Sequence, residues 1–244
     1  MLRYTAGEDH QLDGRLVVYD VRASIAHAEM LAEQGLLSNS DCQAIVQGLN
    51  ELLAEYEAGD WQIRLEDEDV HTALETHLTA KIGEAGGRVH LGRSRNDQVL
   101  TAVRLYLRDA AAEVTDSAAA IVDALQRVSQ AQGEIALPGT THMQHAMPSS
   151  VALWSDGFAE AFADAIAGLN SALRRINKNP LGSAAGYGTP GLSLDRDSTT
   201  EKLGFAETQE PVTAVQLSRG KAEAGLLFEL TLLMQDLGRL ASDL

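Results

Sequence analysis

The chain has 244 residues, 45% of them hydrophobic, which is enough to bury a core in one or two folded domains and excludes an intrinsically disordered protein. It carries 35 acidic and 19 basic residues, and the net charge of −16 excludes a protein that binds nucleic acid through a basic surface. The single cysteine, Cys42, rules out a disulfide within the chain, while the polar start and the lack of any apolar run of ~20 residues predict a cytoplasmic protein without a membrane anchor.

Short helices are predicted in the first part of the chain. Alanine and leucine are abundant, aromatic residues make up only 5%, and the first proline is Pro138, so we expect an all-α fold. Helical patterns cover residues 21–34, the stretch from Ser38 to near Gly59, and residues 66–84. Together they predict a small N-terminal helical domain at about residues 1–90.

Long helices are predicted in the remainder, residues 91–244. Small or apolar residues recur at steps of three or four from 96 to about 132, which indicates a helix of ~50 Å. A second long helix is expected over 149–177, and a third from 212 to the last residue. Residues 179–211 between them form a loop-rich connection with one short helix near 199–203. Helices this long predict an oligomeric bundle shared between subunits.

The first polar cluster stands where the longest helix is expected to begin. It is Arg93-Ser94-Arg95-Asn96-Asp97-Gln98, directly after a glycine-rich turn. A helix N-terminus offers free N–H groups and a partial positive charge, so two arginines, a hydroxyl and an amide there favour a carboxylate-binding corner. The alternative is a helix cap made by Asn96 or Asp97, with the arginines in surface ion pairs. The two interpretations are compatible.

Two further polar clusters lie at helix ends. Thr141-His142 stands in a stretch between Pro138 and Pro148, where a histidine in a short turn between helices could exchange protons near neutral pH or be an ordinary loop residue. No acidic or cysteine partner stands at metal-ligand spacing from it, so no metal is expected. The acidic run at 66–69 is followed by Val70-His71, and it could be a solvated helix start or could hold a guanidinium group.

Taken in order, these clusters resemble the aspartase/fumarase superfamily, and most closely its argininosuccinate lyase branch. Residues 86–99, Gly-Gly-Arg-Val-His-Leu-Gly-Arg-Ser-Arg-Asn-Asp-Gln-Val, are similar to the first signature of that branch. Further similar segments are 19–27, 68–71, 141–144 and 179–182. The resemblance covers the chain from about residue 15 onward, and it favours the functional interpretation of the first two clusters.

The resemblance implies the last step of arginine biosynthesis, a reversible β-elimination of argininosuccinate to fumarate and arginine. It implies no metal or organic cofactor. A base removes a proton next to a carboxylate, fixed donors stabilise the resulting carbanion, and an acid protonates the departing guanidinium nitrogen. It also implies a homotetramer whose sites draw residues from three subunits, with a small-molecule substrate and neither nucleic acid nor membrane as a partner.

Site residues are carried over by their positions in the matching motifs. Substrate contacts fall on Ser24, Asn96 and Thr141. The carboxylate corner is lined by Ser94 and Arg95, and His142 is an acid/base residue or orients one. Asp69 and His71 are further candidates near the amino-acid end of the substrate.

One signature of the family is not found in these 244 residues. It is the loop Gly-Ser-Ser-x-Met-Pro-x-Lys-x-Asn, which in the family carries the serine assigned as the proton-abstracting base. We therefore expect an N-terminal portion that ends within its third long helix and is inactive by itself. Another lyase of the superfamily, acting on adenylosuccinate, aspartate or fumarate, and a non-catalytic homologue of the lens-crystallin kind are the alternatives. His145 and Met147 differ from the common pattern, so both free and acylated argininosuccinate remain candidate substrates.

Overall fold

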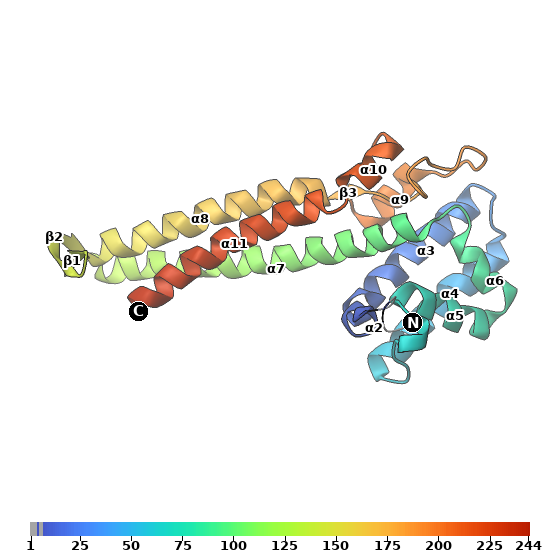
Figure 1. Ribbon diagram of the computed structural model, residues 1–244, viewed down its shortest axis with the longest axis horizontal. Coiled ribbons are helices and arrows are strands. Elements are labelled where there is room, and N and C mark those ends of the chain that lie inside the picture. Colours follow the sequence, from blue (N-terminus) through green and yellow to red (C-terminus); the bar gives the residue numbers. More distant parts are fainter. Residues whose placement is uncertain (1–3, 5–6) are drawn as a thin grey trace. The chain divides into compact units, whose positions relative to one another are not determined.

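The computed structural model describes Tyr4 and residues 7–244, so the first part of the polar start lies outside the described residues. Helices dominate the described residues, which confirms the all-α class (Figure 1). Contacts divide the chain into two compact units. The first unit runs to Leu107 and includes Asn177–Arg219, and the second unit holds Arg108–Ile176 and Gly220–Leu244. The two units are defined by contacts between residues. The boundary expected near residue 90 was instead drawn where short helices give way to long ones, and it stays a prediction.

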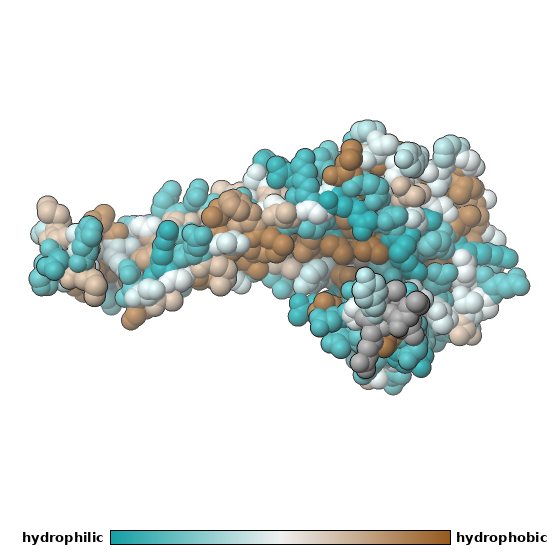
Figure 2. All heavy atoms as spheres, viewed as in Figure 1, coloured by the Kyte–Doolittle hydropathy of each residue, from teal (hydrophilic) through white to brown (hydrophobic). Residues whose placement is uncertain are grey.

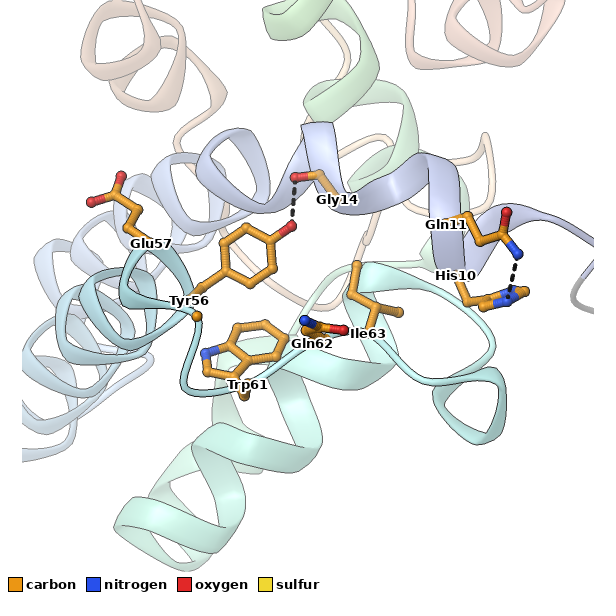
Figure 3. A pocket seen from close by; sticks show the side chains of 9 residues that line it. His10, Gln11, Gly14, Tyr56, Glu57, Trp61, Gln62 and Ile63 are labelled. Carbon is orange, nitrogen blue, oxygen red and sulfur yellow. Dashed lines mark hydrogen bonds between the residues drawn. The ribbon is translucent and has the colours of Figure 1, made fainter.

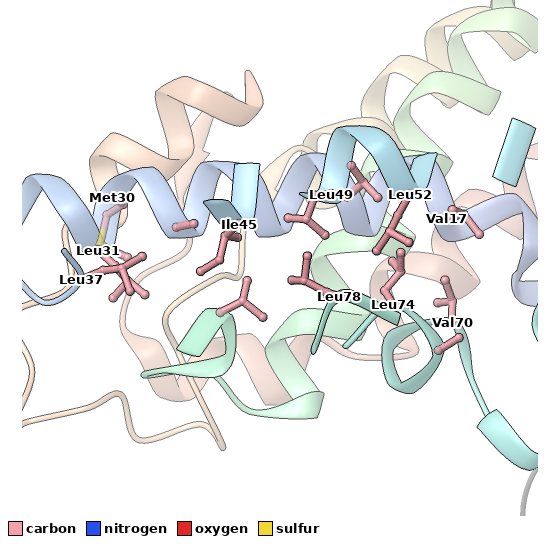
Figure 4. Close-up of a cluster of buried hydrophobic side chains, with 14 of the residues drawn as sticks. Val17, Met30, Leu31, Leu37, Ile45, Leu49, Leu52, Val70, Leu74 and Leu78 are labelled. Carbon is pink, nitrogen blue, oxygen red and sulfur yellow. The ribbon is translucent and has the colours of Figure 1, made fainter. Parts of the chain in front are cut away.

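The first unit opens with short helical elements around a shared apolar core. In chain order these are α2 (Asp9–Leu12), the 3-10 turn η1 (Asp13–Leu16), α3 (Val17–Glu33), α4 (Asn39–Ala58), η2 (Leu65–Asp67), α5 (Val70–Ile82), α6 (Glu84–Gly87) and η3 (Arg88–His90). Leucine, isoleucine and valine side chains of α3, α4 and α5 fill the core, as Figure 4 shows. Burial of each such side chain contributes about 1.5–3 kcal/mol.

Local sequence decides where these helices begin and end. Ser38 accepts a hydrogen bond from the Asp41 N–H, and Gly59 takes a left-handed conformation, so α4 has the predicted limits. The single helix predicted over 66–84 is wrong. Asp69 caps a new helix by accepting from the Thr72 N–H, and this divides the segment into η2 and α5.

The rest of the first unit contains the start of the longest helix, two short helices and a small parallel strand pair. The first turns of α7 (Arg95–Gln132) belong to it, with β3 (Lys178–Asn179), α9 (Arg196–Leu203), β4 (Glu207–Thr208) and α10 (Val212–Ser218). Strand β3 pairs with β4 in parallel. The buried Asn179 amide donates to the hydroxyls of Thr199 and Thr200 at 2.9 Å each, which ties the strand to α9.

The second unit consists of long helices and one hairpin. The rest of α7 is followed by β1 (Ala136–Thr141), β2 (Gln144–Ser150), α8 (Val151–Ile176) and α11 (Lys221–Asp243). The predicted extents of α7 and α8 agree with the structure within two residues. The third long helix is wrong as a single element, because Gly220 has a φ of 74° and separates α10 from α11.

Large apolar side chains reach the surface of the second unit. Leu227, Phe228 and Met234 of α11 are 61% to 63% exposed. Figure 2 shows hydrophobic residues gathered along these long helices. In the part of the chain that the structure describes, no helix is both long enough and apolar enough to cross a membrane.

Candidate active site

The start of α7 is fixed by a reciprocal cap. Ser94 Oγ accepts a hydrogen bond from the Asn96 N–H at 3.3 Å, and Asp97 Oδ1 accepts one from the Ser94 N–H at 2.9 Å. These two bonds resemble a capping box, although the Ser94 hydroxyl accepts from the second residue of the helix and not from the third. Ser94 therefore stands at the N-cap position, because α7 begins at Arg95, and the predicted Asp97 contributes to the cap from the third helical position.

Arg93 connects this helix start to α3. Its side chain is buried, and its Nη1 donates to Ser24 Oγ at 3.0 Å. Burial lowers the pKa of the Arg93 guanidinium, although an arginine stays charged at neutral pH. We call Ser24, Arg93, Ser94, Arg95 and Asn96 the α7 corner.

The carboxylate of Asp20 is buried next to residues of the α7 corner. Asp20 Oδ1 accepts from Gln98 Nε2 at 3.1 Å, and Asp20 Oδ2 lies 2.9 Å from His71 Nδ1. Burial by itself raises the pKa of Asp20, but His71, Arg93 and the Gln98 amide outweigh burial and hold that pKa below its ordinary value. Asp20 is therefore a buried anion. Its signal in the sequence is an acidic residue on an otherwise apolar helix face, four residues before Ser24.

Arg95 faces the start of α5. Its Nη2 donates to Thr72 Oγ1 at 3.2 Å, and its Nε lies 3.7 Å from Asp69 Oδ2. Asp69 also caps α5. The structure thus brings the predicted residues Asp69 and Arg95 together, and it gives Asp69 the structural role that was its alternative interpretation.

Asn96 is exposed and has a partner that the sequence did not reveal. Its Oδ1 accepts from Arg219 Nη1 at 2.8 Å, while its Nδ2 donates to Ser94 Oγ at 3.3 Å. Arg219 lies immediately after α10, far from Asn96 in the sequence. The α7 corner therefore has a third arginine beside it in the first unit.

Thr141 and His142 belong to the second unit, at the turn of the β1–β2 hairpin. Thr141 pairs with Gln144, so His142 and Met143 form a two-residue turn, with φ values of 52° and 60°. The hydroxyl of Thr141 lies 3.0 Å from His142 Nδ1, and both residues are exposed. The expectation of a turn between helices is corrected here, because two strands flank the turn.

A separate pocket in the first unit contains none of the predicted site residues. Figure 3 shows its lining by α2, the following turn and the end of α4, with Tyr56 donating to the Gly14 carbonyl at 3.2 Å. Trp61 and Ile63 supply apolar walls. Among the described residues, no group of three or more histidine, cysteine or acidic side chains could hold a metal ion.

A family model described as "Lyase" matches residues 2–244. This match covers almost all of the sequence, so the chain belongs to that lyase family.

The chain is also similar to particular lyases among curated proteins and solved structures. The chain is 47% identical over 244 residues to an argininosuccinate lyase of Sorangium cellulosum, covering 100% of this chain and 56% of that protein. It is 41% identical over 242 residues to that of Thermotoga neapolitana, covering 99% and 61%. EDDS lyase in complex with formate, and a variant of EDDS lyase with bound fumarate, each have a TM-score of 0.85 and 27% identity, covering 95% of this chain and 45% of theirs. The chain therefore spans little more than half the length of these curated relatives.

Proposed function

We propose that this chain forms the substrate-binding part of an argininosuccinate lyase, which eliminates fumarate from argininosuccinate and releases arginine. The observation that carries the proposal is the α7 corner, where the buried Arg93 contacts Ser24 at the start of a long helix. The argininosuccinate lyases similar to the whole chain support it. The proposal includes a role in arginine biosynthesis and a cytoplasmic location.

The hydrogen bonds of the α7 corner leave donors free for a carboxylate. Ser24 Oγ accepts from Arg93, and Ser94 Oγ accepts from Asn96, so both hydroxyl protons remain available. The first N–H groups of α7 add a partial positive charge. Arg95 supplies a full positive charge, which locally opposes the net charge of −16.

The proposed chemistry gives each remaining predicted residue a role. Ser94, Arg95 and Asn96 bind the carboxylates of the succinyl group, with Ser24 as a further contact. Thr141 binds substrate, and His142 is an acid/base residue or orients one. The preorganised donors stabilise the negative charge that develops when the proton is removed.

We further propose a homotetramer in which neighbouring subunits complete each site. The exposed Leu227, Phe228 and Met234 support an oligomer, because apolar surface on long helices is stabilised when a second helical surface covers it. The serine expected as the base is not assigned to any residue of this chain.

The test uses the complete polypeptide that the gene encodes. Fumarate absorbance is followed after addition of argininosuccinate, N-acylated argininosuccinate, adenylosuccinate or aspartate. We expect release from free or acylated argininosuccinate alone. Release only from adenylosuccinate or aspartate would assign another lyase, and no release from any substrate would favour the crystallin-like alternative. Residues 1–244 alone are expected to release none.

A matched pair of variants connects the activity to the α7 corner. Asn96→Ala removes a predicted carboxylate donor and is expected to lower kcat/KM by about 100-fold, since charge-assisted hydrogen bonds contribute roughly 1.5–3 kcal/mol. Asn50→Ala is the control, because Asn50 is also an exposed asparagine, and it donates to the Val46 carbonyl within α4. Equal activity of the two variants would remove Asn96 from the site.

A further inference from the structure

We propose that Asp97 is a positioning residue, whose single carboxylate holds the start of α7 and the 182–184 turn together and so fixes the α7 corner. The inference rests on the proposed function, because it concerns the site at which the substrate would bind. Asp97 is fully buried. It therefore acts through its neighbours, while Ser94, Arg95 and Asn96 make the contacts with substrate.

Three backbone N–H groups converge on this carboxylate. Oδ1 accepts from Ser94 at 2.9 Å, and Oδ2 accepts from Gly182 at 3.0 Å and from Ala184 at 2.8 Å. Buried N–H groups left without an acceptor cost roughly 1–3 kcal/mol each. Because one side chain satisfies all three, the helix start and the turn are held at a fixed separation.

The turn on the other side of Asp97 is itself held firmly. The Leu181 N–H donates to Asn179 Oδ1 at 3.0 Å, and Arg196 Nε donates to the Leu181 carbonyl at 2.9 Å. Gly182 has a φ of 82°, and a Cβ there would meet the Arg196 side chain at 2.9 Å. The turn is therefore a fixed support, to which Asp97 attaches the first turn of α7.

Asp97 also affects the α7 corner through Arg93. The carboxylates of Asp20 and Asp97 both interact electrostatically with the buried Arg93 guanidinium. Loss of the charge at Asp97 would leave Asp20 and Glu75 as the acidic groups that act on the guanidinium. The guanidinium would then shift relative to Ser24, which accepts its hydrogen bond at 3.0 Å.

The test is Asp97→Asn in the complete polypeptide. An asparagine keeps one acceptor oxygen but places a donor where the second oxygen stood, so it can hold Ser94 or the 182–184 turn but not both. We expect KM for argininosuccinate to rise about 10- to 100-fold, with kcat per folded molecule within about threefold, because a misplaced corner weakens binding of substrate and transition state alike. A purely structural role would reduce the folded fraction, lowering the apparent kcat at an unchanged KM, and this result would overturn the inference.

Ser38→Ala is the matched control. Ser38 is also a capping residue of the first unit, and its Oγ accepts from the Asp41 N–H at 3.1 Å at the start of α4. The variant loses a helix cap that belongs neither to the α7 corner nor to the contacts given above for the 182–184 turn. We expect it to melt at a lower temperature with an unchanged KM, and a KM as high as that of Asp97→Asn would overturn the inference.

Measuring fumarate binding tests the positioning role of Asp97 separately from the proposed lyase activity. Calorimetry with fumarate needs no turnover. Weaker fumarate binding by Asp97→Asn than by the wild type supports the positioning role, even if the wild type releases no fumarate from argininosuccinate and the proposed function fails. Equal fumarate affinity of variant and wild type overturns the positioning role while leaving a measured lyase activity intact. A wild type that binds no fumarate overturns both.

Discussion

His27 is a completely buried histidine that the structure keeps neutral. Its Nε2–H donates to the Leu91 carbonyl at 2.7 Å, one turn of α3 after Ser24. Burial lowers the pKa of His27 to about 3, and the positive charge of Arg93 acts in the same direction. The unfolded chain, in contrast, would bind a proton near the ordinary pKa of 6.5.

The wild type should therefore lose stability as the pH falls from about 6.5 toward 3. In this window the unfolded state binds the extra proton, so the free energy of unfolding decreases by about 1.4 kcal/mol per pH unit for this one group. His27→Gln keeps a donor for Leu91 and removes the titration. Urea unfolding between pH 6 and pH 4 should show a smaller slope by about that amount in the variant, and an identical slope would contradict this assignment.

Asp20 is buried in its charged form, whereas His27 is buried in its neutral form. The cationic and amide groups around Asp20 stabilise its negative charge. Asp20→Asn should lower the free energy of unfolding by about 3–5 kcal/mol, since it removes a buried carboxylate that acts on buried Arg93 and lies beside His71 Nδ1. Chemical denaturation measures this loss. Asp60→Asn, at an exposed residue after α4, should change it by less than about 0.5 kcal/mol, and similar losses for both would refute the network.

Among the secondary-structure elements, the β1–β2 hairpin has the most unusual backbone. Met143 is fully exposed and has a φ of 60°, a conformation that costs a side-chain-bearing residue about 1–2 kcal/mol. Met143→Gly should therefore increase the protection of the hairpin amides in hydrogen exchange, while helix amides stay unchanged. His142 remains in place, so the variant also tests whether a firmer turn alters activity. Faster exchange in the hairpin would contradict the expectation.

The elements differ in how well their sequences predict them. The long helix α7 was predictable, because small and apolar residues recur at steps of three or four over its whole length. The hairpin was not, because its six- and seven-residue strands are mostly exposed and their sequences do not alternate apolar and polar residues. The break at Gly220 was also missed, since apolar residues continue on both sides and the helices are separated by two residues, the extended Arg219 and Gly220 with its positive φ.

The candidate site was predictable only as far as its motif is contiguous. Ser94, Arg95 and Asn96 follow one another in the sequence and lie together at the helix start. Asp20 and Arg219 join them through tertiary packing, and nothing in a single sequence indicates which distant residues will pack together. The motif could thus suggest the donors of the α7 corner, but neither the buried Asp20 nor the exposed Arg219.

For the molecule as a whole, the apolar surface of the second unit predicts assembly. An apolar groove between α7 and α11 is lined by Val114, Ile121, Leu230 and Leu237, and more apolar side chains of α11 are exposed beside it. Leaving this surface in water would favour association with another subunit.

Leu227→Glu combined with Phe228→Glu should therefore dissociate the proposed tetramer into smaller species. Light scattering would show the lower mass, and circular dichroism would show retained helix, because glutamate is a good helix former. Gln235→Glu adds a charge at an exposed polar position of the same helix and should leave the mass unchanged. A tetramer that persists in the double variant would show that these residues lie outside the interface.

The parallel pairing of β3 with β4 has a consequence for how this chain can vary. Lys178 lies opposite Glu207 and Asn179 opposite Thr208, so the polypeptide leaves and returns at almost the same point. Such a closed excursion can gain or lose residues at its tip with little change in closure entropy. We take as its tip the exposed residues Pro190 and Gly191, which follow the hydrogen bonds within residues 183–188. Insertions there would leave the ends of the excursion, and the turn that Asp97 grips, in their present places, so related chains can diverge at this tip while keeping the same binding corner.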